Sequence, residues 1–257
     1  MSNTTPRLTL IALSDSLLPS PEAVAGQLAE RFPDAPSFSV TSQTESGVTF
    51  RFGEATGNYT LVEQAIPWDK IEGPCTLAWY WPEATEVMKS HTRHLFLTLV
   101  DETKDAVSRI MHLTQFTVAL ASTTPSIGLV WGPSVTVHKP VDFALVAAKM
   151  SRDDLPLHLW IDFRVSQRDD GALMLFTTGM DSLGHREFEV ECFQGEPNAL
   201  AGAVYNIAHY VIEKGPILKD GEAIGLPDGG QMNVEIGPSM IDPGMEVVKL
   251  TFEAQSA

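Results

Sequence analysis

The chain has 257 residues, of which 44% are hydrophobic and 19% charged, the composition of an ordinary globular protein with one large or two small domains. Its formal net charge is −16, from 33 acidic and 17 basic residues spread along the whole chain. This balance disfavours nucleic acids and anionic membranes as partners, because both are bound mainly through cationic side chains. A basic protein partner would be attracted, although the charge can also serve only to keep the protein in solution.

Neither the cysteines nor the N-terminus indicates export. Cys75 and Cys192 lie far apart in apolar, strand-like runs, and two such thiols do not make a disulfide framework. The apolar run at residues 8–13 is too short for a signal peptide or a membrane span, and Asp15 follows it closely. We therefore expect a cytoplasmic protein with reduced thiols.

The first part of the chain alternates strand and helix patterns. Residues 21–32 carry apolar side chains at helical spacing, and Pro33 and Pro36 end the pattern. Runs of β-forming residues between turn residues predict four strands, of which the second and third form a hairpin. These strands cover residues 7–13, 37–44, 47–52 and 59–66. A loop is expected at 67–74.

The densest apolar and aromatic run follows that loop, and we expect the rest of the fold to pack around it. It reads as strand, short helix and strand, over residues 75–81, 82–91 and 94–100. Trp79 and Trp81 alternate with Tyr80, and this period of two predicts the first strand. The three rings are expected in the core, because large aromatic side chains dominate core burial. The alternative is that they form a surface that binds a ligand or a partner.

The second part of the chain also contains predicted strands and helices that would cover them. Its predicted helices cover residues 103–122, 140–150 and 197–213. Its predicted strands cover residues 126–131, 157–166, 172–178, 186–193, 232–236 and 247–252. The turn sequence at 168–171 joins two of these strands as a hairpin.

This order of elements predicts an α+β protein with mixed or mostly antiparallel sheets covered by helices. The chain forms either one large domain or two intimate subdomains. In the second case, residues 1–66 form an N-terminal α+β subdomain and residues 75–257 the main domain. The boundary then falls near residues 66–74, although a continuous sheet through both parts is equally compatible with the pattern.

Common cofactor and catalytic motifs are missing from the sequence. No phosphate-binding glycine loop follows a strand, and no C-x-x-C, H-E-x-x-H or G-x-S-x-G pattern occurs. The glycine-rich stretch at 228–230 has no helix after it. We therefore predict no cofactor and lean against an enzyme, although many active sites assemble from distant residues.

The most unusual polar pattern lies at residues 181–191. Four polar side chains alternate with apolar or basic ones and would share one face of a strand: they are His185, Glu187, Glu189 and Glu191. Such a set can bind a hard cation or act as an acid and base pair. The competing interpretation is a solvated sheet face over a core that contains Cys192. Asp181, Ser182 and His185 are also close in sequence and are weak candidates for a catalytic group.

Several short stretches of the chain resemble a bacterial family. They are AWYWPEA at 78–84, VWG at 130–132, LHLWIDF at 157–163, TTGMDSLGHREFEV at 177–190 and NIAHYVIEKGPILKDGEAIG at 206–225. Together they resemble the family known as domain of unknown function 4261, over roughly residues 75–250. The resemblance implies a soluble bacterial protein and brings no activity or catalytic residues with it.

The preferred functional prediction is a non-enzymatic module that binds a basic protein partner, in the manner of an immunity protein or an adaptor. One alternative is a hydrolase or metal-dependent enzyme with its site near residues 181–191. Another is a small-molecule binder that uses Trp79 and Trp81. The number of subunits and the identity of a partner are left open by the sequence.

Overall fold

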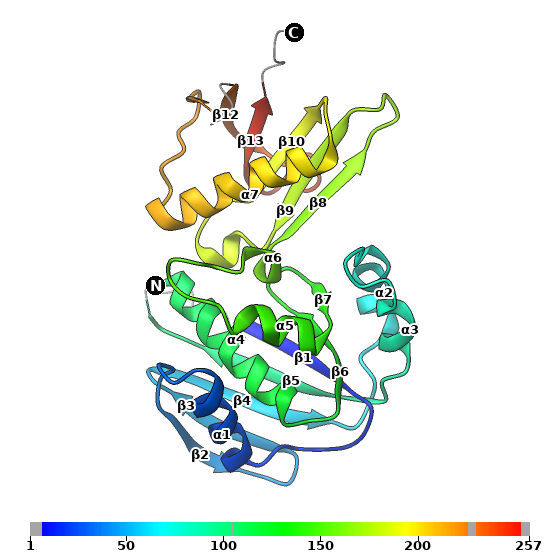
Figure 1. The fold of residues 1–257 in the computed structure, drawn as a ribbon, viewed down its shortest axis with the longest axis vertical. Helices are drawn as coiled ribbons and strands as arrows, with labels where there is room; N and C mark the ends of the chain where they lie inside the picture. Colours follow the sequence, from blue (N-terminus) through cyan, green and yellow to red (C-terminus); the bar gives the residue numbers. More distant parts are fainter. Residues whose placement is uncertain (1–6, 104, 226–229, 253–257) are drawn as a thin grey trace. The chain divides into compact units, whose positions relative to one another are not determined.

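The computed structural model describes residues 7–103, 105–225 and 230–252. The chain divides into two compact units, residues 1–160 and 161–257 (Figure 1). Over the described residues, the first unit contains a seven-stranded antiparallel sheet and the second a six-stranded mixed sheet, so the predicted α+β class is confirmed. The segment 66–74, where a boundary was predicted, lies inside the first unit.

The sheet of the first unit has the strand order β2-β3-β4-β5-β1-β6-β7. The strands are β1 (Arg7–Leu13), β2 (Phe38–Gln43), β3 (Gly47–Phe52), β4 (Ala55–Val62), β5 (Arg93–Val100), β6 (Ser126–Trp131) and β7 (Thr136–His138). Apart from the short β7, each of these strands was predicted from its pattern of β-forming residues, although the strand predicted at 59–66 lies at 55–62. β1 and β5 lie in the centre, where their side chains are covered on both faces.

Three helices cover one face of this sheet: α1 (Pro21–Arg31), α4 (Ala106–Ser122) and α5 (Pro140–Ala147). Ser20 caps α1 by accepting from the N–H of Ala23, and Asp105 caps α4 in the same way. Phe116 of α4 contacts the rings of four residues of the sheet and stacks on one of them, Phe50, with 4.1 Å between centroids. This aromatic cluster joins α4 to the sheet.

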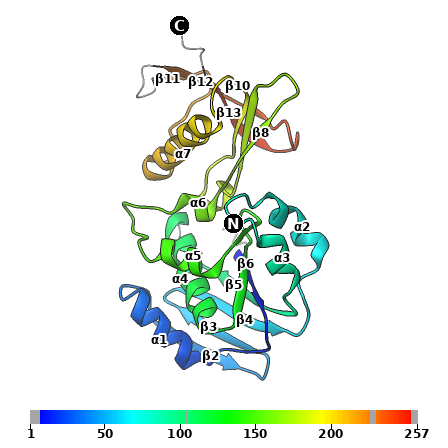
Figure 2. The ribbon, with the colours of Figure 1, turned by 45° about the vertical axis from the view of Figure 1, so that its right-hand side comes forward.

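The opposite face is covered over β1, β6 and β7 by α2 (Trp68–Leu77) and α3 (Ala84–Lys89), which lie side by side in Figure 2. The prediction of a loop at 67–74 and a strand at 75–81 was therefore wrong. Ile71, Cys75 and Ala78 recur at helical spacing, and all three are buried in one cluster. The alternating aromatics that suggested a strand lie in the turn between the two helices.

A second difference concerns residues 157–160, which were predicted as the start of a strand and form the short helix α6 (Leu157–Trp160). Trp160 is fully buried, and its indole N–H donates to the hydroxyl of Thr114 at 2.9 Å. A buried indole needs such a partner, and the bond fixes this turn against α4. The strand begins only afterwards, in the second unit.

The sheet of the second unit has the strand order β11-β12-β13-β10-β9-β8. Its strands are β8 (Asp162–Gln167), β9 (Leu173–Thr178), β10 (Phe188–Phe193), β11 (Ala223–Gly225), β12 (Gln231–Pro238) and β13 (Glu246–Phe252). β10 pairs with β13 in parallel, and the other pairs are antiparallel. The predicted β8–β9 hairpin is confirmed, and Gly171 supplies the positive φ of 84° that its turn needs. The helix α7 (Pro197–Lys214) packs on β8 and β9.

A short 3₁₀ turn, η1 (Asp181–Leu183), connects β9 to β10. Across the described part of the chain, every helix is too short or too polar to span a lipid bilayer. The glycine-rich stretch singled out at 228–230 lies mostly outside the described residues.

Candidate binding surface

The turn between α2 and α3 exposes three large side chains, Leu77, Trp79 and Tyr80, which we call the Trp79 surface. The indole of Trp79 is 85% exposed, whereas that of Trp81 is 5% exposed and belongs to the core under α3. The prediction that all three rings lie in the core is therefore wrong for Trp79 and Tyr80, and the three rings do not form one platform either. An exposed tryptophan of this degree is unusual, because its ring is among the largest apolar groups that folding can remove from water.

Two contacts of Tyr80 connect the Trp79 surface to the sheet. Its hydroxyl donates to the carbonyl of Val137 in β7 at 2.9 Å, and its ring stacks on the imidazole of His138 with 5.7 Å between centroids. Trp79 meets the ring of Tyr80 edge-on, also at 5.7 Å, and its backbone N–H donates to the carbonyl of Leu77. The edge of one ring therefore meets the exposed indole, and the backbone bond fixes the course of the chain at Trp79.

A buried polar chain lies under Tyr80. The hydroxyls of Ser134 and Thr136 are 2.9 Å apart, and Thr136 bonds to Nε2 of His138 at 3.0 Å. Burial and, to a smaller extent, nearby His158 lower the pKa of His138 to about 3. The imidazole is thus neutral near pH 7. All three side chains are buried, so they support the surface and are not placed to attack a substrate.

Sequence reasoning missed these three residues. Their only signal is the alternation of polar and apolar residues in Ser134–His138, in which the polar side chains would ordinarily be assigned to solvent.

The helices beside the Trp79 surface carry uncompensated negative charge. Lys70 already pairs with Asp69 at 3.3 Å, and the ammonium of Lys89 lies over the ring of Trp68, 4.8 Å from its centre. Three exposed carboxylates on or next to these helices have no ion pair within the described residues: they are Glu72, Glu83 and Glu86. The exposed apolar group therefore has acidic neighbours.

The second unit shows where the predicted residues of 181–191 lie. Glu187 is buried and accepts from the hydroxyl of Thr177 at 2.7 Å and from the backbone N–H groups of Gly179 and Asp181 at 2.8 and 3.2 Å. Burial raises the pKa of Glu187, and these hydrogen bonds act in the opposite direction. This carboxylate holds the η1 turn.

Glu189 likewise accepts hydrogen bonds from a loop and holds it in place. Its carboxylate accepts from the hydroxyl of Ser239 and from the N–H of Met240, the latter at 2.9 Å. Glu191 is exposed and pairs with Lys249 at 2.8 Å. The predicted solvated face is therefore wrong for the two buried glutamates, because the η1 turn and the loop between β12 and β13 cover them and supply backbone donors that need acceptors.

The four residues suggested for a metal thus have separate partners and surroundings. His185 is half-buried, and burial lowers its pKa. In the part of the chain that the structure describes, no three His, Cys, Asp or Glu side chains are grouped so that they could hold a metal ion.

The catalytic candidates lie in the η1 turn. The hydroxyl of Ser182 is buried and donates to the carbonyl of Gly179 at 2.7 Å, while Asp181 is exposed. Cys192, predicted to face the core, is exposed. A shift of register between Val190 and Phe193 explains this difference, because one extra residue in a strand breaks the alternation of its faces.

Residues 176–251 match the family model described as a domain of unknown function, DUF4261. The second unit carries a DUF4261 domain. The resemblance expected from the sequence is confirmed over these residues, and residues 75–175 lie outside the matched range. No curated protein and no solved structure matches the chain.

The DUF4261 domain thus contains β10, α7 and both buried glutamates, and the Trp79 surface lies outside it. The family match brings no activity with it.

The stability of the DUF4261 domain is expected to depend on pH through Glu187. Because the folded-state pKa of Glu187 is above the ordinary value of 4.5, the folded state binds this proton more tightly than the unfolded state does. The resulting stabilisation is fully present below the ordinary value and is lost as the pH rises through the folded-state pKa. We expect this part of the pH dependence to disappear in Glu187→Gln, as measured by urea unfolding at a series of pH values. An unchanged slope in the variant would contradict the assignment.

Proposed function

We propose that the protein binds a basic protein partner through the Trp79 surface, acting as an immunity protein or an adaptor would. The exposure of Trp79 carries the proposal. Leaving an indole in water forgoes the stabilisation that its burial would bring, about 2 to 3 kcal/mol for a large apolar side chain. A partner that covers the ring would recover this free energy on binding.

The structure around the ring supports this role. Tryptophan and tyrosine are the residues most often found as binding hot spots. The ring of Tyr80, already held by Val137 and His138, loses little conformational entropy when it is covered. Glu72, Glu83 and Glu86 are placed to attract cationic side chains around the apolar contact. The net charge of −16 acts in the same direction over longer distances.

The two rival predictions have less support. Trp79 and Trp81 cannot enclose a small molecule between them, because one is exposed and the other is in the core. A hydrolase or metal-dependent enzyme near 181–191 would need free polar groups, and Glu187 and Glu189 are occupied by backbone donors.

The test is affinity capture from the lysate of the host with the tagged full chain, at low and moderate salt, read by mass spectrometry. We expect a basic protein that the parent and Ile241→Ala retain and Trp79→Ala loses. Ile241 is a matched control, because it is an exposed apolar residue of the other unit, 55% exposed. Equal retention by both variants would contradict the proposal, and so would capture that salt does not weaken.

A further inference from the structure

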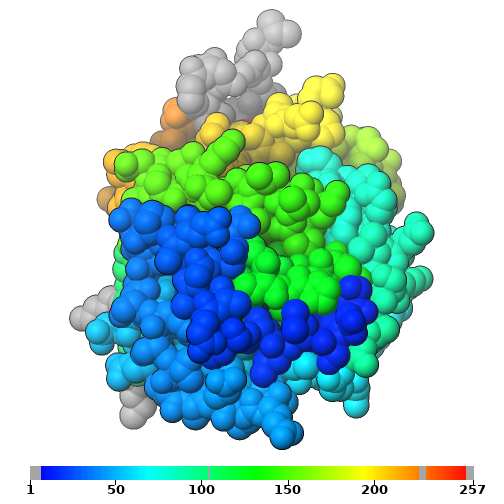
Figure 3. Space-filling view, turned by 60° about the horizontal axis from the view of Figure 1, so that its bottom comes forward, coloured from blue at the N-terminus to red at the C-terminus, as the bar shows by residue number. Residues whose placement is uncertain are grey.

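We propose that a groove in the first unit binds a small amphiphilic carboxylate, that is, an anionic head with an apolar tail. The groove lies between the end of α4 and the exposed side of α5, with the last residue of α1 at its edge. Its lining residues are Arg31, Ala121, Ser122, Ser126, Pro140, Val141, Ala144, Leu145 and Ala148. Figure 3 shows this side of the molecule, where the blue atoms of α1 border green atoms of the later segments.

The apolar wall of the groove comes from the composition of α5. Almost every residue of this helix is apolar, yet only Phe143 and Ala147 are buried. Val141 and Leu145, one turn apart, are 53% and 63% exposed. A helix that is apolar all round is normally covered on every side, so this half of α5 lacks a covering group within the described first unit.

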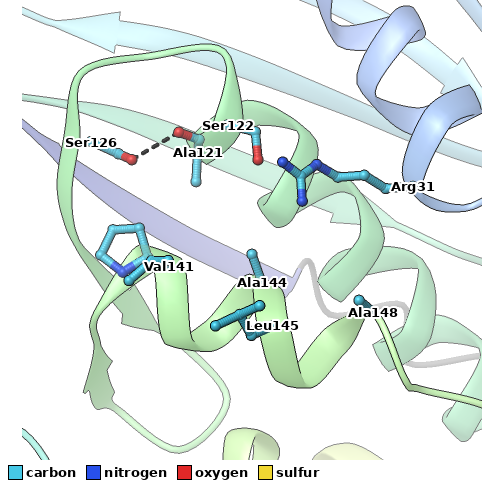
Figure 4. Close-up of a pocket in the computed structure, with 9 residues that line it drawn as sticks. Arg31, Ala121, Ser122, Ser126, Val141, Ala144, Leu145 and Ala148 are labelled. Carbon is cyan, nitrogen blue, oxygen red and sulfur yellow. Dashed lines mark hydrogen bonds between the residues drawn. The ribbon is translucent and has the colours of Figure 1, made fainter.

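The space itself comes from small side chains. Ala121 and Ser122 at the end of α4 face Ala144 and Ala148 of α5, and none of them reaches across (Figure 4). The hydroxyl of Ser126 donates to the carbonyl of Ala121 at 2.8 Å, which keeps the loop after α4 closed over the helix end. The groove has a volume of about 430 Å³, within the range of small-molecule sites.

Arg31 gives the groove its charge. Its Nε donates to the side chain of Gln27 at 2.8 Å, and within the described residues no carboxylate forms an ion pair with it. In Figure 4 the guanidinium is directed toward Ser122 at the edge of the groove. Its remaining N–H groups are available to a carboxylate, which a guanidinium can bind with two parallel hydrogen bonds.

The positive charge of Arg31 indicates which class of ligand fits the groove. A chain with a net charge of −16 repels anions in general, so an anionic ligand needs a local cation. Arg31 supplies that cation beside an otherwise apolar wall. The fitting ligand therefore carries a carboxylate at one end and an aliphatic body that can lie against Ala144 and Leu145.

Decanoate is a suitable probe, and isothermal titration calorimetry with the full chain measures its binding. We expect saturable binding below the micelle-forming concentration, and weaker binding of decanol, which has the same tail and no charge. Arg31→Gln should weaken decanoate binding about tenfold, the loss of one charge-assisted contact of about 1.4 kcal/mol. Arg31→Lys should retain part of the affinity.

The matched control is Arg51→Gln, which removes an exposed arginine of β3 on the same unit. We expect it to bind decanoate as the parent does. Leu145→Ser should weaken decanoate and decanol alike, because it shortens the apolar wall. Absence of saturable decanoate binding would overturn the proposal, as would equal effects of Arg31→Gln and Arg51→Gln. These outcomes do not depend on the Trp79 surface, so either proposal can fail without the other.

Discussion

Phe116→Ala is expected to lower the free energy of unfolding of the first unit by about 4 kcal/mol, near the upper end for large-to-small changes in a core. Phe116 is fully buried in α4 and contacts the rings of Phe38, Phe50, Phe52 and Tyr59. Removing it leaves a cavity between α4 and the sheet and also removes the stacking with Phe50. Urea unfolding followed by circular dichroism measures the loss.

The matched control for this change is Phe96→Ala. Phe96 lies on β5 of the same sheet but is only partly buried. Its loss should cost about half as much or less, because less apolar area returns to water. Similar losses for the two variants would contradict the view that Phe116 is the centre of this core.

Glu187→Ala is expected to destabilise the second unit by about 3 kcal/mol. The change leaves the N–H groups of Gly179 and Asp181 and the hydroxyl of Thr177 without their acceptor. A buried donor without a partner costs about 1 to 3 kcal/mol, and water entering the space of the lost side chain would recover part of the total. Thermal unfolding monitored by circular dichroism measures the effect.

Two controls separate the lost hydrogen bonds from the lost charge. Glu187→Gln keeps one carbonyl oxygen for the two backbone donors, so it should cost about 1 kcal/mol. Glu191→Ala removes an exposed glutamate from the same strand, and its pair with Lys249 should contribute about 0.5 kcal/mol or less. If all three variants were equally stable, Glu187 would not be the acceptor that holds the η1 turn.

Local sequence patterns predicted the secondary structure correctly where a single hydrophobic period dominated the segment. The apolar spacing of α7 and the turn sequence at 168–171 each have a single interpretation, and the structure confirms both elements. The strand predicted at 75–81 was wrong because Cys75 and Ala78 belong to a helical pattern that starts earlier in the chain. The aromatic residues after them alternate with a period of two, as residues of a strand do. Such a conflict is decided by packing, which no short window of sequence contains.

The candidate sites, too, were predicted from the sequence only in part. The sequence singled out Trp79 and Tyr80 by residue type, but their exposure depends on how the turn after α2 is anchored to β7. Alternation assigned Glu187 and Glu189 to one face of a strand, although only Glu189 lies in β10, which begins at Phe188. It could not show that loops from distant parts of the chain cover that face, because this is a property of the tertiary fold.

The most direct measurement of the central claim is the dissociation constant of the captured basic partner for the parent and for Trp79→Ala, at low and moderate salt. Loss of a hot-spot tryptophan should weaken binding by about 2 kcal/mol or more, roughly thirtyfold. Salt should weaken the parent complex, because the acidic neighbours of the ring contribute to it. A dissociation constant that is the same for both proteins would show that the partner binds elsewhere.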